Sequence, residues 1–245
     1  MTMNDSLPTN SISATTSRPL SDRSGVTDAV RTQILATEHW SLLATRSMTW
    51  NEVFSRASMF VTVLSAAVVA LALVAQATAF GPGFRLFALL MLPIVLLVGV
   101  ATVLRLSDAN TDDFWLVVGM NRLRHAYLEL APELEPYFVT AHHDDEASVM
   151  RSYGLNARLR LSRILAGTPT LVAAINVVVV GVLATLVAQT LSAPDAAAMA
   201  IGVIAALAAA VAHGALAYRS ISSGRRAHHA HFPADERPAS VSLPR

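Results

Sequence analysis

The stretch ASMFVTVLSAAVVALALVAQATAF, residues 57–80, decides the fold. It contains no charged residue, and at about 1.5 Å per helical residue it is long enough to cross the roughly 30 Å hydrocarbon core of a bilayer. Three further apolar runs have the same character, and the only charge in them is Arg85 near the start of the first: residues 84–104, 168–191 and 196–218. The sequence therefore predicts an all-α membrane protein with four transmembrane helices.

The composition agrees with this prediction and excludes several classes of function. Of the 245 residues, 53% are apolar and 14% are charged, against roughly 25% charged residues in ordinary globular domains. The mean hydropathy is +0.49. A net charge of +1 gives no electrostatic basis for binding nucleic acid. The chain has no cysteine, which excludes disulfides, thiolate metal sites and cysteine nucleophiles.

Short connections pair the four spans into two hairpins. Residues 81–83 (GPG) separate the first two spans, and residues 192–195 (SAPD) separate the last two. Because connections this short force neighbouring helices to run antiparallel, we expect one transmembrane hairpin over 57–104 and another over 168–218. The polar segment 105–167 lies between them and is expected to be helical.

The placement of arginine predicts the orientation of the spans. Arginines flank the spans on the side of the two termini and the central segment: Arg46, Arg56, Arg105, Arg122, Arg124, Arg158, Arg160, Arg163, Arg219, Arg225 and Arg226. The opposite side has only Arg85. We therefore expect a plasma-membrane protein with both termini and the central segment in the cytoplasm. The polar residues 1–25 and 219–245 are expected to be disordered.

Two striped helices are expected outside the membrane, at the same membrane face. Residues 26–56 contain no Gly or Pro from Thr27 onward and predict a helix that runs directly into the first span. Its stripe has alternating spacings of three and four residues: Ala36, Trp40, Leu43, Ser47, Trp50 and Phe54. Thr111 is expected to cap a second helix that stops at Pro132. The stripe of that helix contains Leu116, Met120, Leu123, Tyr127 and Leu130. The two helices are expected to pack on each other or, alternatively, on copies from another subunit.

Polar side chains within the spans are candidate intramembrane contacts. Asn176 and His213 lie at similar depth on neighbouring spans, so an interhelical hydrogen bond between them is expected. The alternative is a polar lining or a protonation switch. Gln76 and Gln189 occupy similar outer depths, where they can pair with each other or across an oligomer axis. No Asp or Glu lies within the spans, which argues against proton- or sodium-coupled transport.

Two further features of the spans concern helix geometry. Pro93 removes a backbone hydrogen bond and is expected to kink the second span, with a gating hinge as the alternative. Small residues recur every four positions along the last span: Ala198, Gly202, Ala206, Ala210 and Gly214. Such a row allows close helix packing, either within the chain or in an oligomer.

Residues 142–146 (HHDDE) concentrate possible metal ligands, with His142, His143 and Asp144 as the candidates. Adjacent side chains on an extended segment point to opposite faces, and the acidic residues also suit the first turn of a short helix. We therefore expect no metal site and no cofactor. The chain contains no GxSxG, no phosphate-binding glycine loop and no HExxH, so an enzyme is not expected.

Several stretches resemble uncharacterised integral membrane proteins of actinobacteria: residues 37–43 (TEHWSLL), 50–52 (WNE), 120–127 (MNRLRHAY), 133–138 (ELEPYF) and 142–146. The resemblance covers about residues 35–218 and implies no established activity. A cytoplasmic helix, a two-span hairpin and a second cytoplasmic helix are also similar in layout to SLATT-type effector domains. Those domains are proposed to form pores or membrane-disrupting assemblies in bacterial conflict systems. The second hairpin departs from that layout.

Together these patterns indicate a non-enzymatic membrane protein that assembles through its helices as a scaffold, regulator or sensor. Its expected partners are the lipid bilayer and either a second copy of the chain or another membrane protein. The alternative is an oligomeric channel or pore lined by Gln76, Asn176, Gln189 and His213. A membrane enzyme built on residues 142–146 is a third possibility.

Overall fold

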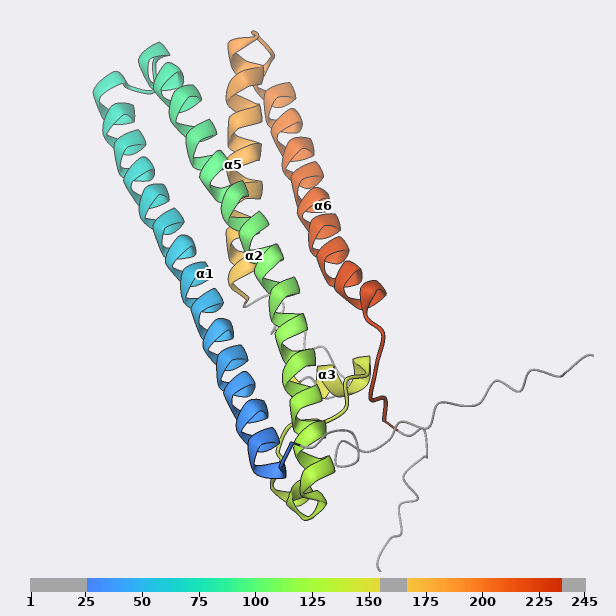
Figure 1. Ribbon diagram of the computed structural model, residues 1–245. Coiled ribbons are helices and arrows are strands. Elements are labelled where there is room, and N and C mark those ends of the chain that lie inside the picture. The colour runs from blue at the N-terminus through green and yellow to red at the C-terminus, as the bar shows by residue number, and fades with distance from the viewer. Residues whose placement is uncertain (1–25, 155–166, 235–245) are drawn as a thin grey trace, which may run out of the picture.

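The computed structural model describes residues 26–154 and 167–234, and every regular element within them is helical (Figure 1). In chain order they are α1 (Asp28–Thr78), α2 (Pro82–Leu130), the 3₁₀ helix η2 (Pro132–Tyr137), α3 (Glu146–Ser152), α5 (Thr168–Thr190) and α6 (Asp195–Ala227). Helices α1, α2, α5 and α6 are long and apolar enough to cross a membrane. The predicted all-α fold with four membrane-spanning helices is confirmed.

The four long helices form two antiparallel hairpins, α1 with α2 and α5 with α6 (Figure 1). Helix α2 also packs against both α5 and α6, so it is the central helix of the bundle. The connection between α1 and α2 has left-handed backbone conformations at Ala79 and Phe80, with φ angles of 46° and 59°. Helix α2 then begins at Pro82, where the fixed φ of proline suits the first turn of a helix.

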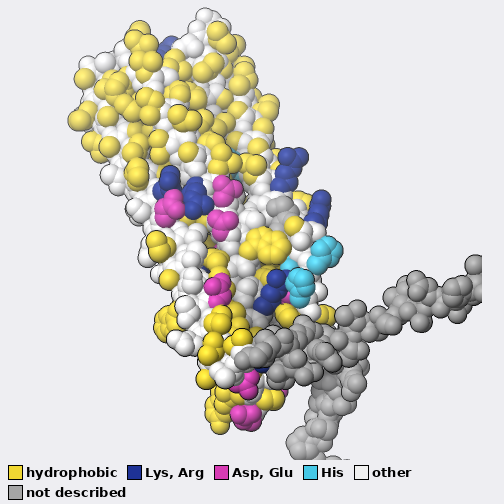
Figure 2. All heavy atoms as spheres, viewed as in Figure 1, with side chains coloured by type: hydrophobic (Ala, Val, Ile, Leu, Met, Phe, Trp, Pro, Cys, Tyr) yellow, Lys and Arg dark blue, Asp and Glu magenta, His cyan; other side chains and the backbone are white. Residues whose placement is uncertain are grey.

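Helices α1 and α2 are 51 and 49 residues long, and both continue well past their apolar parts. We call residues 28–56 of α1 and 105–130 of α2 the stalk. Figure 2 shows charged side chains gathered over the stalk, while the opposite half of the molecule is covered by apolar side chains. The long uninterrupted α1 agrees with the helix predicted to run directly into the first span.

The predicted start of a separate helix at Thr111 is wrong. Helix α2 passes through this position without a break, since residues 101–118 contain neither Gly nor Pro. The Thr111 hydroxyl instead bonds within its own helix, 3.3 Å from the carbonyl oxygen of Ser107. The predicted end of this helix before Pro132 agrees with the structure. Pro93 lies exposed on the outer surface of α2, and the helix continues on both sides of it.

The C-terminal boundary also differs from the prediction. Helix α6 continues beyond residue 218 to Ala227, and residues 228–234 pack against the segment that precedes α3. The disorder expected from residue 219 onward is therefore wrong for 219–234, where hydrogen bonds to the stalk and to Asp144 order the chain. Residues 1–25 and 235–245, also expected to be disordered, lie outside the described residues, as do Arg158, Arg160 and Arg163.

Candidate functional site: the buried carboxylates of the stalk

Asp113 is the hub of the stalk. This buried carboxylate on α2 accepts hydrogen bonds from two α1 side chains: Arg46, at 2.6 Å (Nε) and 3.3 Å (Nη2), and the indole Nε1 of Trp50, at 2.8 Å. The hydroxyl of Tyr153, which directly follows α3, donates a further bond of 2.8 Å. A buried charge is tolerated only when it is paired and hydrogen-bonded, and Asp113 meets that condition. It therefore ties α1, α2 and the chain after α3 together.

Both titratable partners of Asp113 have a pKa above their usual value. The hydrogen bond to Asp113 raises the pKa of Arg46 above its usual value. Burial, together with the nearby carboxylate, raises the pKa of the Tyr153 hydroxyl well above its usual value. Tyr153 thus stays protonated and keeps donating to Asp113 at physiological pH.

Asp144 is a second buried carboxylate, and it holds the C-terminal segment. It accepts hydrogen bonds from Nε of Arg122 at 2.7 Å and from the backbone N–H groups of His231 and Phe232 at 2.9 and 2.8 Å. Its own N–H donates to the carbonyl of Phe232 at 3.2 Å, and the ring of His228 contacts its carbonyl oxygen. Burial raises the pKa of Asp144, but the hydrogen bonds outweigh burial and leave the pKa below its usual value.

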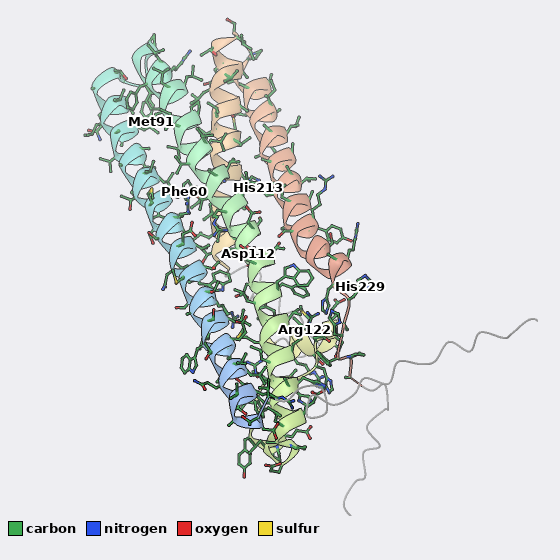
Figure 3. The ribbon with its side chains drawn as sticks, in the orientation of Figure 1. Phe60, Met91, Asp112, Arg122, His213 and His229 are labelled. Atoms are coloured by element: carbon green, nitrogen blue, oxygen red, sulfur yellow. The ribbon has the colours of Figure 1, made fainter. Side chains whose placement is uncertain are left out.

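Neighbouring contacts extend this clamp. Asp145 caps the N-terminus of α3 by accepting from the N–H of Ser148 at 3.0 Å, and it also accepts from the N–H of Ala234 at 3.2 Å. Arg122 reaches the carbonyl of His229 at 3.4 Å, and Figure 3 shows these two residues on the stalk and just after α6. We call residues 228–234 the docked tail, since Asp144 and Asp145 bind its backbone.

Buried Asn121 fixes the loop that carries Asp144. Its Nδ2 donates to the carbonyl of His143 at 2.8 Å, and its Oδ1 accepts from Arg124 at 2.8 Å and Ser152 at 2.9 Å. One amide on α2 therefore connects both sides of the short helix α3 to the stalk.

The candidate metal ligands of residues 142–146 serve this packing instead. The rings of His142 and His143 lie 4.3 Å apart, and the ring of His125 stacks on Phe232 at 4.5 Å. Burial lowers the pKa of both His125 and His142. Asp144 is already committed to Arg122 and to the docked tail. Among residues 26–154 and 167–234, no group of three or more His, Asp or Glu side chains has an arrangement that could hold a metal ion.

An ion-pair network lies where the stalk meets the apolar half. Glu52 on α1 accepts from Arg56 on the same helix and from Arg105 on α2, both at 2.9 Å. These hydrogen bonds lower the pKa of Glu52 to about 2. Arg105 also lies 3.6 Å from Asp112. These charges mark the polar boundary of the membrane-spanning part.

The structure does not bring the intramembrane polar candidates together. His213 bonds to the carbonyl of Ala209 on its own helix at 2.8 Å, so the expected Asn176–His213 hydrogen bond is absent. Asn176 is fully buried against Gly99 of α2, and neither atom of its carboxamide has a partner among the described residues. A Cβ at position 99 would overlap the Asn176 oxygen, so glycine provides the space for this amide.

The two glutamines likewise do not share a lining. Gln189, near the end of α5, donates to Asp195, the first residue of α6, at 3.3 Å across the turn between them. Gln76 is exposed on α1. The small residues of α6 do not all pack against α5. A Cβ at position 202 would lie 2.8 Å from the carbonyl oxygen of Gly181, whereas a Cβ at position 214 would have no described neighbour within 4 Å. Close packing of α6 on α5 therefore involves only part of the predicted row.

The helix-packing candidates of the stalk fall into a buried or half-buried group and an exposed group. Met120 is buried, and Leu116, Leu123, Tyr127 and Trp50 are half-buried. Trp40 is 71% exposed, Leu43 41% and Phe54 50%. Most of the stripe predicted on α1 therefore faces outward, since Arg46 and Val53, a quarter turn around the helix, face α2 instead. We call Trp40, Leu43, Ser47 and Phe54 the outward stripe.

The four apolar helices, paired in two hairpins around a central helix and extended by a polar stalk, fit a multi-helix membrane protein. No protein-family model matches the chain, and no match is found among curated proteins or solved structures.

Proposed function

We propose that the protein is a non-enzymatic membrane scaffold or regulator that assembles with a second copy of itself through the outward stripe. The observation that carries this proposal is the exposure of Trp40, Leu43 and Phe54. Their helix has an inner face of its own, and that face is already packed on α2. The stripe is thus a second apolar surface of the same helix.

The spacing of the outward stripe suits pairing with another helix. Trp40, Leu43, Ser47 and Phe54 follow one another at three, four and seven residues, so each falls on an a or d position of a coiled-coil heptad. Burying large apolar side chains contributes about 25 cal/mol for each Å² removed from water, and aromatic side chains supply the largest areas. Two copies inserted in one membrane with one orientation present this stripe in parallel. A twofold axis along the membrane normal brings stripe against stripe.

The distribution of charge supports a cytoplasmic location for the stalk. The basic side chains Arg46, Arg56, Arg105 and Arg122 all lie on the stalk, while Arg85 lies at the far end of the bundle. Positive charge is retained on the cytoplasmic side of membrane proteins. A scaffold with this orientation offers its docked tail and stalk to cytoplasmic partners.

The hydrogen bonding of the buried carboxylates supports a non-enzymatic role. Both oxygens of Asp113 and both oxygens of Asp144 accept hydrogen bonds from structural donors. A general base needs a lone pair directed at a substrate, and these are used for packing. The pore alternative has less support because Asn176, His213 and Gln189 each face a different neighbour.

Cysteine crosslinking in native membranes tests the proposal, since the natural chain has no cysteine. Ser47→Cys places a thiol on the outward stripe. Met48→Cys is the matched control, because Met48 is 72% exposed and lies about 120° around the helix from the stripe. We expect a crosslinked dimer from Ser47→Cys, little from Met48→Cys, and loss of the dimer when Trp40→Glu is added. Equal crosslinking of the two positions, or a Ser47→Cys adduct only with another protein, would refute self-assembly.

A further inference from the structure

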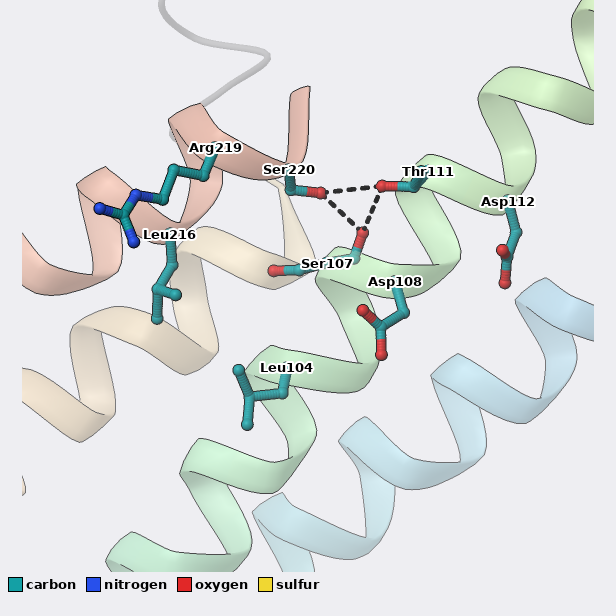
Figure 4. A pocket seen from close by; sticks show the side chains of 8 residues that line it. All are labelled: Leu104, Ser107, Asp108, Thr111, Asp112, Leu216, Arg219 and Ser220. Atoms are coloured by element: carbon teal, nitrogen blue, oxygen red, sulfur yellow. Dashed lines mark hydrogen bonds between the residues drawn. The ribbon is translucent and has the colours of Figure 1, made fainter. Parts of the chain in front are cut away.

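A groove of about 500 Å³ runs between α2 and α6 where the stalk begins (Figure 4). Leu104 and Leu216 line its apolar end, and Asp108 and Arg219 line its polar end. The two ends follow directly from the sequence. Leu104 is the last residue of the second apolar run, and Arg219 comes directly after the fourth.

One wall of the groove is closed by internal hydrogen bonds. The Ser220 hydroxyl donates to the carbonyl of Ser107 at 2.8 Å and lies 3.1 Å from the Thr111 hydroxyl. These bonds hold α6 against α2 and are drawn in Figure 4. The polar groups of this wall are thus already engaged with one another.

Two oppositely charged groups remain free in the groove. The carboxylate of Asp108 and the guanidinium of Arg219 are exposed, and neither forms a hydrogen bond or ion pair with another described residue. Asp112, also in the lining, is close to Arg105 at 3.6 Å. Among the described residues, the groove therefore offers one unpaired anion and one unpaired cation next to apolar side chains.

The charged groups of the groove lie where the stalk meets the apolar half of the bundle. The Glu52–Arg105 ion pair lies at the same level of α2, one turn or less from Asp108. Tyr218, next to Arg219, is an exposed aromatic residue of the kind enriched at membrane–water interfaces. A groove that is apolar toward the membrane centre and charged toward the stalk crosses the headgroup level of the leaflet.

We propose that this groove binds phosphatidylethanolamine. Arg219 binds the lipid phosphate, Asp108 accepts hydrogen bonds from the primary ammonium group, and an acyl chain lies along Leu104 and Leu216. The pairing of charges selects among lipids. The quaternary ammonium of phosphatidylcholine has no N–H to donate, and an anionic headgroup meets the carboxylates of Asp108 and Asp112.

Native mass spectrometry of the full-length, delipidated protein tests this site, with phosphatidylethanolamine, phosphatidylcholine and phosphatidylglycerol of identical acyl chains added in turn. We expect the wild type to bind phosphatidylethanolamine about fivefold more tightly than phosphatidylcholine, as one charge-assisted contact at a partly exposed site provides. Asp108→Asn is expected to abolish that preference. Arg219→Gln is expected to weaken both zwitterionic lipids equally.

The control is Arg85→Gln, which removes an exposed arginine at the opposite face of the membrane and is expected to leave the preference unchanged. Because the carboxylate of Asp108 and the guanidinium of Arg219 have no hydrogen bond or ion pair with a described residue, neither substitution removes such a bond from the described part of the fold. Equal affinity of the wild type for the three lipids, stronger binding of phosphatidylglycerol, or an unchanged preference in Asp108→Asn would each overturn the proposal. The outcome does not depend on Ser47 crosslinking, so the two proposals fail separately.

Discussion

Replacing Asp113 by alanine removes the acceptor for three donors at once. Arg46, Trp50 and Tyr153 all lose their bonds to this carboxylate, which is buried between α1, α2 and the chain after α3. The arginine side chain is 34% exposed and can regain hydration. The indole N–H of Trp50 and the hydroxyl of Tyr153 are held by packing and regain less.

The expected loss follows from these environments. Removing one partner of a buried ion pair costs about 3–5 kcal/mol, and each donor left unsatisfied contributes about 1–3 kcal/mol of such a loss. Because Arg46 can rehydrate, we expect the lower end, about 3 kcal/mol, for Asp113→Ala. Asp113→Asn keeps the shape and one acceptor oxygen, so its cost is expected to fall between wild type and alanine.

Reversible unfolding of the purified protein in mixed detergent micelles measures these losses, and a double-mutant cycle with Tyr153→Phe isolates one contact. In the wild type, loss of the Tyr153 hydroxyl is expected to cost about 1–2 kcal/mol. In the Asp113→Ala background the hydroxyl has no acceptor, so its removal is expected to cost close to nothing. Asp112→Ala is the control: its side chain is 58% exposed and paired only at 3.6 Å, so about 1 kcal/mol or less is expected.

Two results would refute this reasoning. One is an Asp113→Ala protein whose free energy of unfolding is no lower than that of the Asp112→Ala control. The other is a Tyr153→Phe cost that is the same with and without Asp113, since this would mean that the hydroxyl does not interact with the carboxylate.

Three further predictions concern the docked tail, the membrane core and pH. Asp144→Asn is expected to release the docked tail and to speed tryptic cleavage after Arg226, at the end of α6, because its buried carboxylate binds two backbone N–H groups. Gly99→Ala is expected to destabilise the bundle by about 1–3 kcal/mol through overlap with the Asn176 amide, and adding Asn176→Ala is expected to restore stability. Unfolding free energy is expected to fall as pH drops below about 6.5, since burial lowers the pKa of His125 and His142 and the unfolded chain binds more protons.

Each of these predictions has a distinct control. Glu133→Gln, an exposed change within η2, is expected to leave tryptic cleavage at the wild-type rate. A Gly99→Ala protein that is not rescued by Asn176→Ala would place the overlap elsewhere, for example at Phe60. For pH, the protein with glutamine at both histidine positions is expected to show a flatter profile between pH 8 and about 5.5. Asp144 affects stability at lower pH. Because its pKa is lowered in the folded protein, it contributes stability that is lost only when the pH falls below about 4.

The spans and hairpins could be predicted because they depend on one-dimensional properties of the chain. An uncharged run such as residues 57–80 has few alternatives to a membrane-spanning helix, and the three residues 81–83 leave no room for anything but a reversal. The continuity of α1 follows in the same way from the absence of Gly and Pro after Thr27.

The site could not be predicted because it depends on pairs far apart in sequence. The three-four spacing from Ala36 to Phe54 predicts one packing face of α1, whereas the structure rotates the helix so that Arg46 reaches Asp113, 67 residues away. A helix capped by Thr111 has Asp113 in its first turn, where acidic residues are common, so the sequence gives no reason to expect a buried acceptor there. The docked tail gives no sequence signal at all, since Asp144 binds backbone N–H groups that every residue except proline has. The Arg46 and Trp50 positions, one turn apart on α1, were the one available clue to a buried acceptor opposite them.

The docking of Phe232 on Asp144 also gives the molecule a mechanical property. Chain segments 88 residues apart are joined there, which closes α3, α5 and α6 into a non-covalent ring anchored on α2 by Arg122. The ring restrains movement of the second hairpin relative to the stalk. A displacement of α6 is opposed at two levels of α2, by the bond of Ser220 to Ser107 near the apolar half and by the docked tail further along the stalk.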